Sequence, residues 1–174
     1  MLYGTPRRRW SPIIDGETAR IPLTQGEFAV IDTTDLPLVA PYAWRVERGP
    51  RTSYAVSTVR RQHLSMHRLI AAPPRQLDVD HRDLNGLNNQ RGNLRPCTHG
   101  QNNQRRVSGR GASPFKGVAF HRPSGLFHAT INVGGRQISL GYHQTERACA
   151  EAYDVGAVTH FGEFALTNKE LGLL

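Results

Sequence analysis

Cysteine is nearly absent from this sequence: only Cys97 and Cys149 occur, and there is no CxxC pair. Thiolate-based zinc sites and disulfide scaffolds both need more cysteines, so the sequence argues against them. Also absent are an N-terminal signal peptide and any apolar run of about 18 residues, the length that a membrane-spanning helix requires. We therefore expect a soluble, cytoplasmic protein with no membrane partner.

Hydrophobic residues are few as well. They make up 38% of the 174 residues, whereas glycine occurs 17 times and proline 11 times. This composition favours short strands, turns and loops over a helical bundle. A chain of this length can hold one ordinary domain or two or three small modules.

Positive charge is abundant and unevenly distributed. The net charge is +8, and most basic residues are arginine, whose planar guanidinium group binds phosphate in a forked geometry. Residues 57–111 carry ten basic and three acidic groups, whereas residues 1–56 carry seven and six and residues 112–174 carry five of each. A solvated basic face accounts for any single arginine but poorly for this distribution. We expect a nucleic-acid surface in the middle third.

The first third of the chain is predicted to be rich in β-strands. Residues 1–19 are irregular, and Arg7 to Arg9 fit either a basic arm on the phosphate backbone or a frayed terminus. Between residues 20 and 63, short runs of β-branched and aromatic residues are separated by Gly, Pro and Asp. This pattern predicts a small antiparallel module.

Residues 77–97 are predicted to form two short strands that enclose a polar loop. Apolar and acidic residues alternate up to Asp80 and His81, as in a strand whose end presents these two side chains. Asparagine side chains in such a loop tie their own backbone into turns. Three are assigned this structural role: Asn85, Asn88 and Asn89.

A helix is expected to begin at Thr98, because Gln101 three residues later completes a capping-box pattern. Asn102 then lies about one turn into this helix and is able to face the strand end. His99 is assigned a capping or phosphate role, and His67 is expected to pack or to contact DNA rather than to catalyse.

These residues resemble the HNH nuclease motif in its His-Asn-Asn form, which is typical of phage and intron-encoded homing endonucleases. The match consists of Asp80-His81, Asn93 twelve residues later and Asn102 nine residues beyond that. The resemblance covers residues 64–107 and implies a ββα-metal nuclease centre. It implies that Asp80 and Asn102 bind one divalent metal, that His81 is the general base and that Asn93 orients His81.

The chemistry of these side chains agrees with the implied roles. Histidine, with an unperturbed pKa of about 6.5, can accept a proton from water at neutral pH. Carboxylate and amide oxygens are hard ligands that suit Mg²⁺ or Mn²⁺ rather than zinc. Three arginines flank the site and could hold phosphates on either side of the scissile one: Arg95, Arg105 and Arg106.

The last third of the chain is predicted to be a separate module over residues 115–168, preceded by a linker at 108–114 and followed by a tail at 169–174. Three strands and one helix are expected, with a hairpin turn at Gly134-Gly135. The segments Phe115-Lys116-Gly117-Val118 and Leu140-Gly141-Tyr142 resemble the Apetala-type DNA-binding domain of plant ethylene-response factors.

That resemblance implies a three-stranded sheet that lies in the major groove of DNA. The candidate contacts are Lys116, Arg122, His128 and Arg136. Ala119 and Leu126 occupy positions where the plant proteins carry basic residues, so the plant sequence preference does not transfer.

The sequence as a whole predicts a modular α+β protein that cuts or nicks double-stranded DNA in a metal-dependent reaction. One metal centre per chain favours a monomer and a nick, unless the protein dimerises. A phage or mobile-element origin in a bacterial host cytoplasm is expected. Two alternatives stay open: a DNA-binding regulator with an inactive nuclease site, and an RNA-binding or RNA-processing protein.

Overall fold

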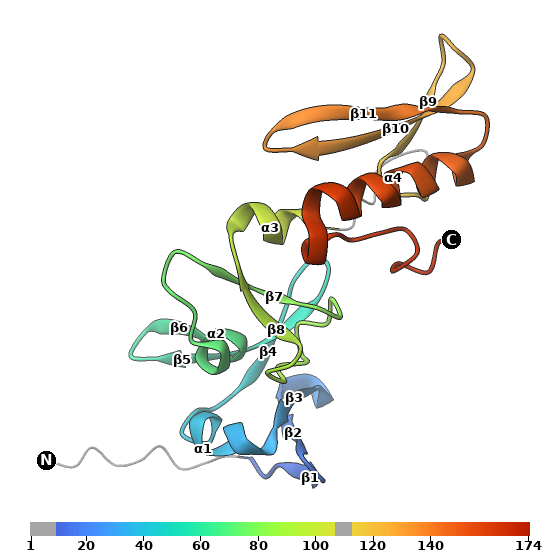
Figure 1. The fold of residues 1–174 in the computed structure, drawn as a ribbon. Coiled ribbons are helices and arrows are strands. Elements are labelled where there is room, and N and C mark those ends of the chain that lie inside the picture. Colours follow the sequence, from blue (N-terminus) through green and yellow to red (C-terminus); the bar gives the residue numbers. More distant parts are fainter. Residues whose placement is uncertain (1–9, 107–112) are drawn as a thin grey trace, which may run out of the picture. The chain divides into compact units, whose positions relative to one another are not determined.

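The computed structural model describes residues 10–106 and 113–174 (Figure 1). Arg7 to Arg9 and most of the predicted linker 108–114 lie outside the described residues. The fold is α+β, built from several small sheets and few helices, as the composition predicts. Contacts divide the chain into two compact units, Met1–Thr98 and His99–Leu174.

The first unit begins with a small antiparallel sheet in the order β1-β2-β3. Its strands are β1 (Ile13–Asp15), β2 (Thr18–Pro22) and β3 (Phe28–Asp32). Buried and more exposed positions alternate along β2 and β3, so the sheet turns one face toward the core. Three short helical segments accompany this sheet: η1 (Thr24–Gly26), η2 (Thr33–Asp35) and α1 (Leu36–Val39).

A second three-stranded antiparallel sheet follows in the order β4-β5-β6. Its strands are β4 (Arg45–Arg48), β5 (Ser53–Val59) and β6 (Gln62–Ser65). The helix α2 (Met66–Ala71) comes directly after β6 and ends at Ala72, which adopts a left-handed conformation. The two prolines after Ala72 cannot continue a helix, which agrees with this end point.

The last two strands of the first unit form the hairpin predicted from the sequence. Strands β7 (Asp78–His81) and β8 (Leu94–Cys97) pair antiparallel, and the register places Asp80 opposite Arg95 and His81 opposite Leu94.

One apolar core joins the β-rich segment to the nuclease segment. Residues 20–63 and 64–107 were expected to be separate modules, but side chains from both ranges pack into the same buried cluster. The members are Ala19, Ile21, Ala29, Ile31, Val39, Trp44, Ala55, Met66, Ile70, Val79 and Leu94. Residues 10–98 therefore act as a single folding unit around this core, because each small sheet alone has too little apolar surface to be stable.

The second unit begins with α3 (His99–Gln104), close to the helix start that the capping pattern predicts. A three-stranded antiparallel sheet in the order β11-β10-β9 follows, and helix α4 packs against it. The remaining bounds are β9 (Val118–His121), β10 (Leu126–Val133), β11 (Arg136–His143), α4 (Glu146–Phe161) and η3 (Gly162–Phe164).

Local sequence signals explain this sheet and helix. Gly134 and Gly135, with φ values of 58° and 82°, form the turn between β10 and β11. Thr145 caps α4, since its hydroxyl accepts a hydrogen bond from the Ala148 backbone N–H at 3.2 Å. Within the described part of the chain, every helix is too short or too polar to cross a membrane.

Candidate active site

Strand β7 delivers Asp80 and His81 to the buried end of the hairpin. Val79 and Leu94 anchor the two strands in the apolar core, so the residues next to them are fixed by packing. Asp80 is 5% exposed and His81 is 6% exposed. A buried carboxylate next to a buried imidazole is uncommon in a purely structural hairpin, because both groups lose hydration there.

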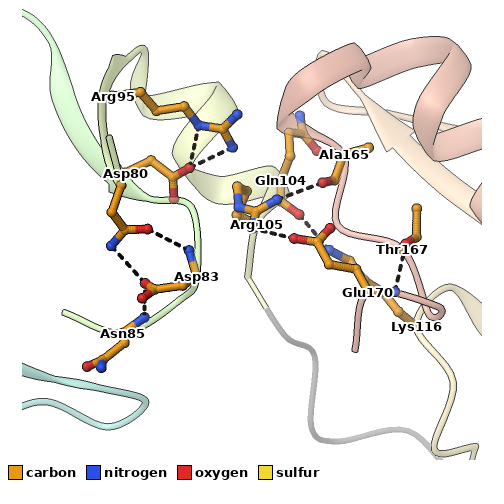
Figure 2. A network of polar contacts seen from close by, with 11 residues as sticks. Asp80, Asp83, Asn85, Arg95, Gln104, Arg105, Lys116, Ala165, Thr167 and Glu170 are labelled. Carbon is orange, nitrogen blue, oxygen red and sulfur yellow. Dashed lines mark hydrogen bonds and ion pairs between the residues drawn. The ribbon is translucent and has the colours of Figure 1, made fainter. Parts of the chain in front are cut away.

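The Asp80 carboxylate forms an ion pair with Arg95 across the hairpin (Figure 2). Arg95 Nε donates to Asp80 Oδ2 at 2.8 Å, and Nη2 lies 2.7 Å from the same oxygen. Both side chains are at most 7% exposed. This burial corrects the expectation that Arg95 holds a DNA phosphate, because its guanidinium group is committed to Asp80 instead.

Asn93 closes the loop between the two strands. Its Oδ1 accepts a hydrogen bond from the Asp83 backbone N–H at 3.0 Å, and its Nδ2 donates to Asp83 Oδ1 at 2.9 Å and to the Asn88 carbonyl at 2.8 Å. The sequence predicts that Asn93 holds the His81 ring. In the structure, the Asn93 side chain instead forms hydrogen bonds to Asp83 and Asn88, which stabilise the loop that follows His81.

Two of the three other loop asparagines form turns, as predicted. Asn85 Oδ1 accepts from the Leu87 N–H at 3.1 Å, and Asn88 Oδ1 accepts from the Gln90 N–H at 3.4 Å. Asn89 differs, because its side chain is completely buried.

The loop is also tied to the N-terminal sheet. The Val30 N–H donates to the Leu87 carbonyl at 2.8 Å, and the Asn89 N–H donates to the Val30 carbonyl at 2.7 Å. Arg91 then makes a bidentate contact with the buried Asp35, in which Nη2 donates to Oδ1 at 2.6 Å and Nε donates to Oδ2 at 3.0 Å. Sequence reasoning missed this connection, because its partners lie more than 50 residues apart.

Two further rings surround His81. The His67 ring centroid lies 5.2 Å from that of His81, and the Tyr54 centroid lies 5.9 Å from it. Burial lowers the pKa of His81, which favours the neutral imidazole that a general base needs. Burial, followed by the nearby His81, lowers the pKa of His67 to about 3, so His67 is neutral at physiological pH. His67 packs against the predicted base, which is one of the two roles expected for it.

A divalent metal would find hard oxygen ligands on this chain. Among residues 10–106 and 113–174, no group of three or more His, Cys, Asp or Glu side chains could enclose a metal ion. The ligands that the sequence predicts are the carboxylate of Asp80 and the side-chain amide of Asn102, which lies on α3. Such an oxygen-only set fits Mg²⁺ or Mn²⁺. Asn102 belongs to the second unit, and its pairing with Asp80 stays a prediction.

The second unit exposes one face of its sheet. Along β10, Ala129 and Ile131 are buried against α4, whereas the alternate residues His128 and Thr130 lie on the opposite face. The His128 ring is stacked on Tyr142, with centroids 4.2 Å apart and planes 6° apart. Arg122 and Arg136 are exposed at the ends of these strands.

The side chains of Lys116 and Arg105 bond to other residues of the second unit (Figure 2). Lys116 Nζ donates to the Gln104 carbonyl at 2.5 Å, and burial lowers the pKa of this ammonium group to about 8. Arg105 pairs with Glu170 at 2.7 Å and donates to the Ala165 carbonyl at 2.7 Å. This corrects the expectation that both side chains contact DNA. Arg106, by contrast, is exposed.

Comparison with known proteins identifies the family. No family model matches the chain. An uncharacterised HNH endonuclease of Acanthamoeba polyphaga mimivirus is 31% identical over 148 residues, which cover 83% of this chain and 76% of the relative. This chain belongs to the HNH endonuclease family.

The chain also resembles plant transcription factors over part of its length. The AP2-like ethylene-responsive factor PLT2 of Arabidopsis thaliana is 40% identical over 72 residues, or 39% of this chain. The ethylene-responsive factor WRI1 of the same plant is 36% identical over 64 residues. The matches span only 13% and 15% of the two factors' lengths. Both halves of the expected architecture, an HNH part and an Apetala-type part, are thereby supported.

Proposed function

We propose that this protein is a metal-dependent endonuclease that hydrolyses phosphodiester bonds in double-stranded DNA. The observation that carries the proposal is the adjacent, buried pair of Asp80 and His81 at the end of β7, in a chain of the HNH family. Asn93 and Asn102 complete the spacing of the family motif, and the loop that holds Asn93 is closed by its side chain.

His81 acts as the general base. Hydrolysis needs a water molecule that loses a proton as it attacks phosphorus, and a neutral imidazole accepts such a proton. The burial that lowers the pKa of His81 keeps this ring unprotonated and ready. Tyr54 and His67 limit the positions that the ring can take, because their centroids lie within 6 Å of it.

Asp80 and Asn102 hold Mg²⁺ or Mn²⁺ in this proposal. When bound there, such a cation would supply charge stabilisation for the phosphate and for the leaving 3′ oxygen. Arg95 orients the Asp80 carboxylate through their ion pair, which fixes the position of the oxygen ligand before a cation arrives. The products are a 5′-phosphate and a 3′-hydroxyl, and one such site per chain favours a nick.

The second unit anchors the protein on DNA. The named relatives are transcription factors, and the open face of the β9–β11 sheet presents polar and aromatic side chains. His128, Arg122 and Arg136 are the contacts that we propose on this sheet, since all three lie outside its packed face. Arg106, exposed after α3, is a further phosphate contact.

A supercoiled-plasmid assay with Mg²⁺ tests the proposal. The plasmid should carry DNA from the genomic neighbourhood of the gene, where a homing-type nuclease would find its target. We expect wild type to convert it to open circle, and His81→Ala and an EDTA control to leave it supercoiled. His63→Ala is the matched control, because His63 is exposed and pairs with Glu47 on the β4–β6 sheet rather than with a residue of the proposed site. Equal cleavage by His81→Ala would exclude His81 as the base.

A DNA-binding regulator with an inactive nuclease site is the second candidate, favoured by the similarity to transcription factors. The same assay separates the two. A protein that shifts target DNA in a gel but cleaves none with either Mg²⁺ or Mn²⁺ would be the regulator.

A further inference from the structure

Asn89 has a buried amide whose bonding is incomplete. Its side chain is fully buried, at 0% exposure. Its Nδ2 donates to the Leu87 carbonyl at 3.0 Å, and this carbonyl can only accept, so the orientation of the amide is fixed. Its Oδ1 is buried and has no hydrogen-bond partner among the residues that the structure describes. A buried acceptor left in this state is unfavourable and needs an explanation.

His81 has a buried ring nitrogen that could donate the hydrogen bond that Asn89 Oδ1 lacks. Its Nε2 is buried and also has no hydrogen-bond partner within the described ranges. The hairpin brings the two residues close together, because Leu94 lies opposite His81 and its N–H donates to the carbonyl of Gln90, the residue after Asn89, at 3.2 Å. Burial lowers the pKa of His81, and a side-chain hydrogen-bonding interaction with Asn89 opposes this shift, in agreement with that placement. An oxygen without a donor and a ring nitrogen that can donate thus belong to neighbouring side chains.

The side-chain amide of Asn93 already has other hydrogen-bond partners. Both ends of its amide are bonded to Asp83 or Asn88 within the loop. Asn89, in contrast, is held in place by its backbone, whose N–H donates to Val30 of β3 at 2.7 Å. The N-terminal sheet therefore fixes the backbone of Asn89.

We propose that Asn89 is the positioning residue of His81, with its Oδ1 accepting a hydrogen bond from His81 Nε2–H. This bond puts the ring proton on Nε2 and leaves Nδ1 free to take the proton of the attacking water. Hydrogen bonds of this kind are often long in a free enzyme and shorten when the substrate binds. The catalytic consequence rests on the proposed nuclease function, whereas the pairing of the two side chains does not.

The tautomer of His81 tests the pairing directly. Protein labelled with ¹⁵N at histidine gives ring-nitrogen chemical shifts that distinguish a proton on Nε2 from one on Nδ1, and His81→Gln assigns the signals. We expect neutral His81 in the wild-type protein to carry its proton on Nε2. Asn89→Leu, of similar size but without an acceptor, should lose this preference. Asn89→Asp, which keeps an oxygen at the same place, should retain it.

Asn88→Ala is the matched control, since it removes a neighbouring loop asparagine that forms a turn. It should leave the His81 tautomer unchanged. Thermal unfolding of each variant shows whether it is folded, and Asn89→Ala replaces Asn89→Leu in the comparison if the latter does not fold. A wild-type proton on Nδ1, or an unchanged tautomer in folded Asn89→Leu, would overturn the proposal.

Activity gives a separate readout. If the nuclease function holds, Asn89→Leu should lower kcat by about 10- to 100-fold with little change in KM, as loss of a supporting hydrogen bond typically does. A tautomer that depends on Asn89 in a protein that cleaves no DNA would uphold the pairing and reject the nuclease.

Discussion

At the scale of single residues, burial decides which of the many arginines are free to contact DNA. Arg95 and Arg105 are each about 5–6% exposed and each pairs with a carboxylate, whereas Arg106 is exposed. The sequence shows that the middle of the chain is basic, but it cannot show which guanidinium groups are consumed by internal ion pairs. Those pairs depend on strand register and on contacts distant in sequence.

Removing the arginine of the buried ion pair should destabilise the protein strongly. In Arg95→Met the Asp80 carboxylate stays buried without its partner, which typically costs roughly 3–5 kcal/mol. Urea unfolding measures the difference from wild type. The control is Arg45→Met, because the Arg45–Glu47 pair is more than 40% exposed on both sides and such pairs contribute about 0–1 kcal/mol. Equal losses of unfolding free energy in the two variants would show that burial does not increase the contribution of the Asp80–Arg95 pair to stability.

Lys116 should give the protein a stability that rises with pH. Its pKa is lowered to about 8 from the model-compound value of 10.5, mainly by burial. The unfolded chain therefore binds more protons than the folded chain between about pH 8 and 10.5, and folding becomes more favourable as pH rises through this range. Urea unfolding at several pH values should show wild type gaining stability relative to Lys116→Met. A pH-independent difference would contradict the lowered pKa.

At the scale of elements, local sequence signals predicted the strands and helices better than they predicted which elements pack against one another. The β-branched and aromatic runs between residues 20 and 63, the capping pattern before α3 and the Gly-Gly turn after β10 each produced the expected element. The shared core and the loop contacts with β3 were missed, because they join segments that no local pattern connects. Asn89 shows the same limit: four asparagines occupy one loop, and only tertiary packing buries this side chain completely.

The ion pair between Arg91 and Asp35 should stabilise the loop that joins β7 to β8. Asp35→Asn removes the charge from a bidentate contact, and hydrogen bonds to charged groups contribute about 1.5–3 kcal/mol. Hydrogen exchange should then be faster at the Asn89 amide, which bonds to β3. Glu47→Gln, at an exposed pair in the same unit, is the control and should leave this exchange rate unchanged.

Gly117 should be intolerant of any side chain. A Cβ there would lie 1.9 Å from Tyr153 Cδ2, and φ is +76°. Gly125 has a similar φ of +69° but nothing within 4 Å, so Gly125→Ala measures the backbone strain alone. Gly117→Ala should be less stable than Gly125→Ala by about 1–3 kcal/mol, the usual range for overpacking. Thermal or urea unfolding provides the comparison, and equal losses would mean that Tyr153 can move aside.

At the scale of the whole molecule, the family relationship and the charge distribution both point to DNA, and salt dependence should reveal which side chains contact it. Each phosphate contact that is lost lowers the slope of log K against log salt by about 0.9. Arg122→Ala and Arg136→Ala together should lower it by about 2, measured by fluorescence anisotropy on the full chain. Arg147→Ala is the control, because Arg147 lies on α4 and pairs with Glu151. An unchanged slope in the double variant would remove the β9–β11 sheet from the interface.

The contacts between β3 and the loop that joins β7 to β8 have a consequence for how homologues of this protein can diverge in sequence. Asp32 accepts hydrogen bonds from Gln90 and Arg91, and Asp35 pairs with Arg91. A recombination that exchanged the first sixty residues between relatives would separate these partners and leave charges without their counterparts. Positions 32, 35 and 91 should therefore change together across homologues. The N-terminal sheet would then be inherited as part of the nuclease rather than exchanged as an accessory.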